Sequence, residues 1–215
     1  MTAYALSALV IAILGSAGLL LHSTLLRTGR IRAGMFCFYT NLSNLLLLLY
    51  EWTLWIASFR PNGGAYRLLS SSTAALLMTL CIWVTHLIYH FVLLPYVRRK
   101  GISFADGADD RIGNILVHYI VPLSTLAQWL LWADKSDLTV QSAALWLIIP
   151  TAYFVFAMLR AKTGKPIGHT SLLYPYPFLN YPHLGAKRFW LGTLGLLLAF
   201  FVLGLLLVGA AQFLA

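Results

Sequence analysis

The sequence predicts an all-α, polytopic membrane protein, and two observations support this prediction. Of its 215 residues, 60% are hydrophobic and only 10% are charged, which leaves too few polar side chains to cover a water-soluble globule. The apolar residues are also gathered in runs, each close to the ~20 residues that a membrane-spanning helix needs. We therefore expect an integral membrane protein built as a bundle of transmembrane helices.

Six such runs follow one another, separated by segments too short to form a soluble domain, so residues 1–215 are expected to form a single domain. Basic residues bound most of the runs. The first ends before Arg27 and the third before Arg98, Arg111 precedes the fourth, Arg160 closes the fifth, and Lys187 precedes the sixth. The six expected helices are residues 3–26, 35–58, 70–96, 112–133, 140–160 and 188–213.

The lysines and arginines set the orientation of these helices. Twelve of the 15 lie in the loops after the first, third and fifth runs, and only three lie on the opposite side. Because basic loops stay in the cytoplasm, we expect these three loops to be cytoplasmic and both termini to lie outside the cytoplasm. Basic runs also attract the cytoplasmic leaflet, so the net charge of +9 predicts contact with membrane lipids and no nucleic-acid partner.

Polar side chains inside the apolar runs are expected to meet in one layer of the bundle. With ~1.5 Å of rise per residue, His118 lies roughly 9 Å from the cytoplasmic end of its helix, and Thr40 and Asn44 lie roughly 7 and 13 Å from theirs. Three more histidines fall at the same level: His22, His86 and His90. An ionisable residue at membrane depth is costly, so this layer predicts a functional site.

The spacing of these residues predicts that they face the interior of the bundle. They recur at helical spacing in three groups: Asn114, His118 and Thr125; Thr40 and Asn44; His86 and His90. Each group forms a polar stripe on an otherwise apolar helix, and such stripes turn away from lipid.

This layer has the ingredients of a nucleophilic site. A hydroxyl beside a neutral imidazole is a nucleophile with its general base, and burial disfavours the charged imidazolium. Side-chain amides of Asn41, Asn44 or Asn114 would donate hydrogen bonds to a developing oxyanion. No Asp or Glu is expected at this depth, so an amide or a tyrosine would replace the usual acid. The alternative is structural, because small polar residues also hold membrane helices together.

His86 and His90 form a second candidate site. Two histidines at i and i+4 can bind one metal, with His22 or His118 completing the set of ligands. No carboxylate or thiolate is expected nearby, and this favours hydrogen-bonded histidines that support His118.

Two further features lie near helix ends. Glu51 stands beside Trp52 and Trp55 near the outer end of its helix and is expected to reach water at the interface. Residues 174–182 hold three prolines, which exclude a helix, and aromatic residues that suit the membrane interface. This segment is either an interface anchor or a lid over a cavity that opens towards the cytoplasm.

Three motifs resemble those of one family of six-helix membrane proteins. They are Phe38-Tyr39-Thr40-Asn41-Leu42-Ser43-Asn44, Asn114-x-x-x-His118-x-x-x-Pro122 and Tyr174-Pro175-Tyr176-Pro177-Phe178-Leu179. Over most of its length, and most strongly from Asn114 onward, the chain resembles bacterial relatives of the androgen-induced and androgen-dependent membrane hydrolases. Animal members hydrolyse fatty-acid esters of hydroxy fatty acids with an intramembrane threonine and histidine. By motif position the resemblance implies Thr40 and His118, although the Asn-Leu-Ser-Asn after Thr40 departs from the animal pattern.

We therefore expect an intramembrane hydrolase of lipid esters in a bacterial inner membrane, with Thr40 as nucleophile and His118 as base. Ser43 offers a competing hydroxyl and belongs with the three asparagines to the expected oxyanion or substrate site. The supporting residues are His22, His86, His90 and Tyr176. A lipid ester or fatty-acyl substrate is expected, without a cofactor or a metal. The alternatives are a transporter or lipid-binding protein whose histidines handle protons or a head group, and a metal-containing protein built on His86 and His90.

Overall fold

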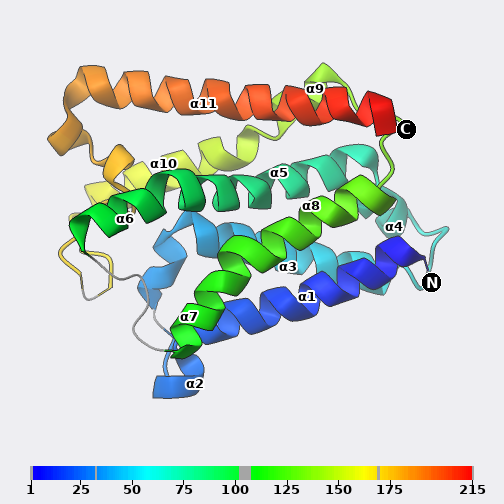
Figure 1. The fold of residues 1–215 in the computed structure, drawn as a ribbon, viewed down its shortest axis with the longest axis horizontal. Helices are drawn as coiled ribbons and strands as arrows, with labels where there is room; N and C mark the ends of the chain where they lie inside the picture. The colour runs from blue at the N-terminus through cyan, green and yellow to red at the C-terminus, as the bar shows by residue number, and fades with distance from the viewer. Residues whose placement is uncertain (1, 32, 102–107, 169, 215) are drawn as a thin grey trace.

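The structure, a computed structural model, describes residues 2–31, 33–101, 108–168 and 170–214, and every regular element within them is a helix (Figure 1). Five helical segments of this part of the chain are long and apolar enough to cross a membrane. The protein is thus an all-helical integral membrane protein, as its composition predicts. The five segments are Ala3–His22, Ser72–Lys100, Asp110–Trp132, Val140–Lys162 and Tyr181–Phe213.

The second predicted helix forms α3 (Tyr39–Ala57) but is not among these five apolar segments. It carries buried polar side chains, and these lower its hydropathy: Thr40, Asn41, Ser43, Asn44 and Glu51. α3 packs against α1 (Ala3–His22) and α5 (Ser72–Ile88). The most polar of the long helices therefore turns its polar side chains towards its neighbours in the bundle, while Leu46, Leu49 and Ile56 on another face are exposed.

The first two helices are shorter than predicted. α1 ends at His22, because Thr24 adopts a left-handed conformation (φ 65°), and the short α2 (Leu25–Thr28) follows. The second run begins with a 3-10 turn, η1 (Ala33–Cys37), and α3 starts only after the extended Phe38. Thr40 therefore lies in the first turn of its helix, and the prediction that it lies more than a turn inside a helix beginning near residue 35 is wrong.

The third and fourth helices are each interrupted by a π-helical turn. In the third, η2 (Tyr89–Leu93) separates α5 from α6 (Leu94–Lys100). In the fourth, η3 (Leu116–Ile120) separates α7 (Ala108–Ile115) from α8 (Val121–Trp132). A proline, Pro95 or Pro122, is the second residue after each interruption. Proline has no N–H to donate, so the regular α-helical ladder cannot pass through it unchanged.

The last two helices also differ from their predicted bounds. The fifth is broken into α9 (Val140–Leu145) and α10 (Ile148–Lys162), and Pro150 lies in the first turn of α10. The sixth, α11 (Tyr181–Leu214), begins before residue 188, since Pro182 is tolerated in a first helical turn. Gly185 (φ 72°, ψ 160°) then interrupts this helix. Ahead of α11 lies the short η4 (Pro177–Leu179).

The arrangement of the helices is a bundle with one outer layer. α1, α3, α5 and α8 pack against one another, and α11 runs along the outside over α9 (Figure 1). α1 and α7 approach very closely: a Cβ on Gly113 would lie 2.7 Å from the backbone nitrogen of His22. The N-terminal end of α1 and the C-terminal end of α11 lie at the same end of the bundle, while α2 and the end of α6 lie at the other.

Glu51 does not reach water, and this corrects the sequence prediction. Its side chain is 0% exposed, and its Oε2 accepts a hydrogen bond of 3.1 Å from the Nε2 of Gln128 on α8. The helical face that carries Glu51 turns towards α8 because the neighbouring positions Leu47 and Leu54 are core residues. Only the helix packing reveals this inward orientation.

Shortening the Glu51 side chain is therefore expected to destabilise the protein. Glu51→Ala leaves a cavity and removes the partner of Gln128, so we expect a loss of about 2–5 kcal/mol. Glu51→Gln keeps the shape without a charge and should stay close to the wild type. Thermal unfolding of the purified variants measures both effects, and an alanine variant as stable as the wild type would contradict the packing described here.

Candidate active site

Thr40 and His118 meet inside the bundle. The Oγ1 of Thr40 lies 3.3 Å from the Nε2 of His118, at hydrogen-bonding distance. Thr40 is in the first turn of α3 and His118 is in η3, and their side chains are only 7% and 6% exposed. The structure thus brings together the two residues that the sequence pairs at similar depth.

The other imidazole nitrogen fixes which atom of His118 carries the proton. Its Nδ1 lies 3.0 Å from the backbone carbonyl oxygen of Asn114. A carbonyl oxygen only accepts, so Nδ1 carries the proton and Nε2 is left with a lone pair. The Thr40 hydroxyl must then donate to Nε2. This is the geometry of a hydroxyl nucleophile beside its general base, with the base oriented by a third group.

The backbone around His118 is adapted to this geometry. In a regular α-helix the carbonyl of His118 would accept from the residue four positions on, but that residue is Pro122, which has no N–H. The Nδ1 of His86 donates to this carbonyl instead, at 2.8 Å. The ring of Tyr89 stacks on the imidazole with centroids 3.8 Å apart. His86 and Tyr89 therefore hold His118 from α5 and η2.

The two π-helical turns were not predicted, although they contribute residues to the site. η3 contains His118, and η2 contains Tyr89 and His90. Single π-helical turns inside α-helices occur frequently at functional sites. The sequence signal is a proline a few residues after an intramembrane histidine, at His118 and Pro122 and again at His90 and Pro95.

The three asparagines make hydrogen bonds within the protein. The Nδ2 of Asn44 donates to the carbonyls of Thr40 (2.8 Å) and Val117 (3.1 Å), so it ties α3 to η3 beside the dyad. Asn41 donates to the Met35 carbonyl. Asn114 donates to the Tyr89 hydroxyl at 2.6 Å. Both amide hydrogens of Asn44 are thus engaged, which favours a structural role for this residue.

Ser43 points to a different neighbour from Thr40. Its hydroxyl lies 2.8 Å from that of Thr85 on α5 and 3.0 Å from the carbonyl oxygen of Thr40. His118 is paired with Thr40 and not with Ser43 in the described hydrogen bonds. The geometry therefore favours Thr40 as the hydroxyl that the imidazole can activate.

Tyr176 lies against the beginning of α3. It is 6% exposed, and its ring packs edge-on against Phe38 and parallel to Phe178. Its hydroxyl lies near the Thr40 side chain and near the backbone of Tyr39 and Thr40. Burial raises the pKa of this hydroxyl, so it remains protonated. The segment around Tyr176 therefore covers the end of α3 that carries Thr40.

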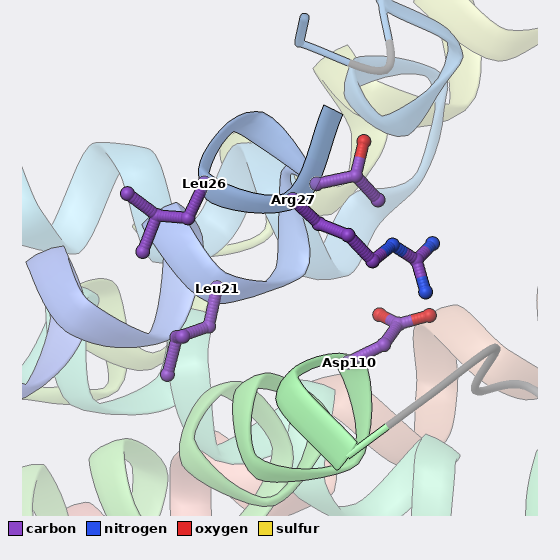
Figure 2. A pocket seen from close by; sticks show the side chains of 5 residues that line it. Leu21, Leu26, Arg27 and Asp110 are labelled. Atoms are coloured by element: carbon purple, nitrogen blue, oxygen red, sulfur yellow. The ribbon is translucent and has the colours of Figure 1, made fainter. Parts of the chain in front are cut away.

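A carboxylate does lie near the histidine layer, contrary to the sequence prediction. The Oδ1 of Asp110 lies 3.0 Å from the Nδ1 of His22, and Asp110 is only 2% exposed. Figure 2 shows the guanidinium of Arg27 directed towards the same carboxylate. Asp110 comes close because Gly113 lets α7 approach the end of α1. Its contacts place it beside His22 and not beside the dyad.

His86 and His90 are engaged with other groups. Their rings stack with centroids 5.8 Å apart, the Nδ1 of His86 binds the His118 carbonyl, and the Nδ1 of His90 lies 3.0 Å from the Tyr119 hydroxyl. In the part of the chain that the structure describes, no three His, Cys, Asp or Glu side chains gather as metal ligands. The arrangement of the two histidines favours support of His118.

Comparison of the chain with protein-family models, with curated proteins and with solved structures finds no match.

Proposed function

We propose that this protein is an intramembrane hydrolase of lipid esters, with Thr40 as nucleophile and His118 as general base. The observation that carries the proposal is the 3.3 Å contact between Thr40 Oγ1 and an imidazole nitrogen left unprotonated by the hydrogen bond to Asn114. Fatty-acid esters of hydroxy fatty acids are the substrate class that the motif resemblance implies.

The proposed reaction proceeds through an acyl-enzyme. Thr40 Oγ1 attacks the ester carbonyl carbon while its proton passes to His118 Nε2. The imidazolium, steadied by the Asn114 carbonyl, then returns this proton to the leaving alcohol oxygen. A water molecule, deprotonated by the same Nε2, then attacks the acyl-threonine carbonyl. The bond from the acyl carbon to Thr40 Oγ1 breaks, Nε2 returns the proton to Oγ1, and the fatty acid is released.

The oxyanion of each tetrahedral intermediate would be stabilised at the beginning of α3. The N–H groups of the first helical turn carry partial positive charge, and the Tyr176 hydroxyl lies near the backbone of Tyr39 and Thr40 in this turn. Oxyanion holes use this combination of backbone N–H and side-chain donors. In this role we favour the backbone N–H groups of Tyr39 and Thr40 together with the Tyr176 hydroxyl. The side-chain amides of Asn41, Asn44 and Asn114 donate to other groups of the protein.

Hydrolysis of a lipid ester by the purified protein tests the proposal directly. The wild type should release free fatty acid from a fatty-acid ester of a hydroxy fatty acid in detergent micelles. A fluorophosphonate probe, which reacts with activated hydroxyls, should label Thr40. Absence of turnover together with absence of labelling would reject the hydrolase.

The proposal includes a topology of six crossings, with both termini outside the cytoplasm of a bacterial inner membrane. Its support is the twelve-to-three distribution of basic residues and the position of both chain ends at one end of the bundle. A C-terminal alkaline phosphatase fusion should be active and a C-terminal green fluorescent protein fusion dark, since these reporters work on opposite sides of the membrane. The reverse result would invert the topology.

A further inference from the structure

A cavity of about 350 Å³ lies between α3 and α10. Its mouth includes Leu46, Ile148 and Phe156, whose side chains are 40–62% exposed. In a helical bundle that crosses a membrane, exposed apolar side chains at this depth face lipid, so the cavity opens sideways towards acyl chains. The rest of its lining consists of the exposed Ala152 and of five residues that are at least partly buried: Tyr39, Leu42, Ser43, Ile149 and Tyr153.

One end of the cavity adjoins the candidate dyad. Tyr39 precedes Thr40 in the first turn of α3, and the Ser43 hydroxyl donates to the Thr40 carbonyl at 3.0 Å. The ring of Tyr153 packs against that of Tyr176, with centroids 6.3 Å apart. From Tyr39 to Leu46 the α3 wall runs roughly 10 Å. The cavity is thus polar near Thr40 and hydrocarbon-like further along the helix.

We propose that this cavity, the α3–α10 groove, binds the acyl chain of the ester substrate, with the ester carbonyl at the tyrosine end beside Thr40. A linear acyl chain fits these features because it is the apolar group that the surrounding membrane supplies and it ends in a polar carbonyl. This inference rests on the proposed hydrolase function and adds the substrate-binding position. Ala152 lines the groove next to Tyr153, and its small side chain leaves room there for the acyl chain.

Chain-length selectivity tests the groove. Purified wild type and Ala152→Trp are compared on p-nitrophenyl butyrate and p-nitrophenyl palmitate. Each buried methylene contributes about 0.8 kcal/mol, or roughly fourfold in binding, so displacing two or three methylenes should lower kcat/KM for palmitate roughly 15- to 60-fold. The butyrate ester has few methylenes to lose from the groove, so its kcat/KM should fall much less than that for palmitate. Ile149→Ala, which widens the groove, should instead favour the longer ester.

Val155→Trp is the matched control, since Val155 lies on the same helix, is 48% exposed and does not line the groove. It should leave the rates for both esters unchanged. An equal loss for both esters in Ala152→Trp, or an unchanged palmitate rate, would overturn the inference.

A binding experiment separates failure of the groove from failure of the hydrolase. A palmitate analogue with a diazirine on its chain is photocrosslinked to the Thr40→Val protein, which needs no turnover. Peptide mapping should place the label on α3 and α10, and Ala152→Trp should remove most of it. A label placed elsewhere, or a groove kept free of label because a second copy of the chain covers it, would reject acyl-chain binding in this groove. Labelling of the groove in a protein that hydrolyses no ester would reject the proposed function alone.

Discussion

Thr40→Val is expected to lower lipid-ester hydrolysis by about 10⁴-fold or more, the scale on which loss of a hydroxyl nucleophile acts. Valine fills the volume of threonine without the oxygen, so the buried site should remain packed and the protein should fold. His118→Ala should be comparably inactive, because the hydroxyl loses its base. The double variant should be little worse than either single variant, since nucleophile and base act as one unit. Steady-state kinetics and thermal unfolding of the same samples measure activity and fold separately.

Thr125→Val provides a matched control for this experiment. Thr125 is a buried helical threonine, 1% exposed, whose hydroxyl donates to the carbonyl of Val121 within its own helix. Its replacement should leave the activity close to that of the wild type. Thr40→Ser keeps the hydroxyl and should retain part of the activity. A stable Thr40→Val protein with full activity would exclude Thr40 as the nucleophile and would turn attention to Ser43.

Tyr176→Phe is expected to lower kcat by about 10²–10³-fold, the usual effect of removing one donor from an oxyanion hole. KM should change little, because the donor acts most strongly on the developing negative charge of the transition state. The phenylalanine ring preserves the packing on Phe38 and Phe178, so the thermal midpoint should stay near that of the wild type. Kinetics with a soluble ester substrate measures the separation of kcat from KM.

Tyr181→Phe is the control for loss of a tyrosine hydroxyl from the same part of the chain. Tyr181 begins α11, is 41% exposed and packs its ring against Phe189. It should keep full activity. A Tyr176→Phe enzyme with unchanged kcat would remove Tyr176 from the catalytic mechanism, and one with a lowered thermal midpoint would indicate a packing role.

Much of the candidate site follows from periodicity and depth. Apolar runs of membrane length predict the helices. Thr40 and His118 each lie near the expected cytoplasmic end of their run, so they are predicted to lie in the same layer of the bundle. The same reasoning failed for Glu51, because its place near a helix end and beside two tryptophans suits an interface carboxylate equally well. Which face of α3 turns towards α8 depends on contacts between helices, and no local pattern records them. The position of Asp110 beside His22 also depends on packing between helices, because Gly113 has no side chain and so lets α7 come close to α1.

The sequence by itself determined an all-helical membrane protein and a polar layer that contains a threonine and several histidines, because burial of apolar runs and the cost of buried polar groups are properties of the residues themselves. Only the tertiary structure decided the hydrogen bonds within that layer. The Nε2 of His118 is unprotonated because Nδ1 donates to the Asn114 carbonyl. In the π-helical turn, the carbonyl of His118 accepts a hydrogen bond from the Nδ1 of His86. These contacts join separate helices or irregular turns, so they exist only once the bundle has packed.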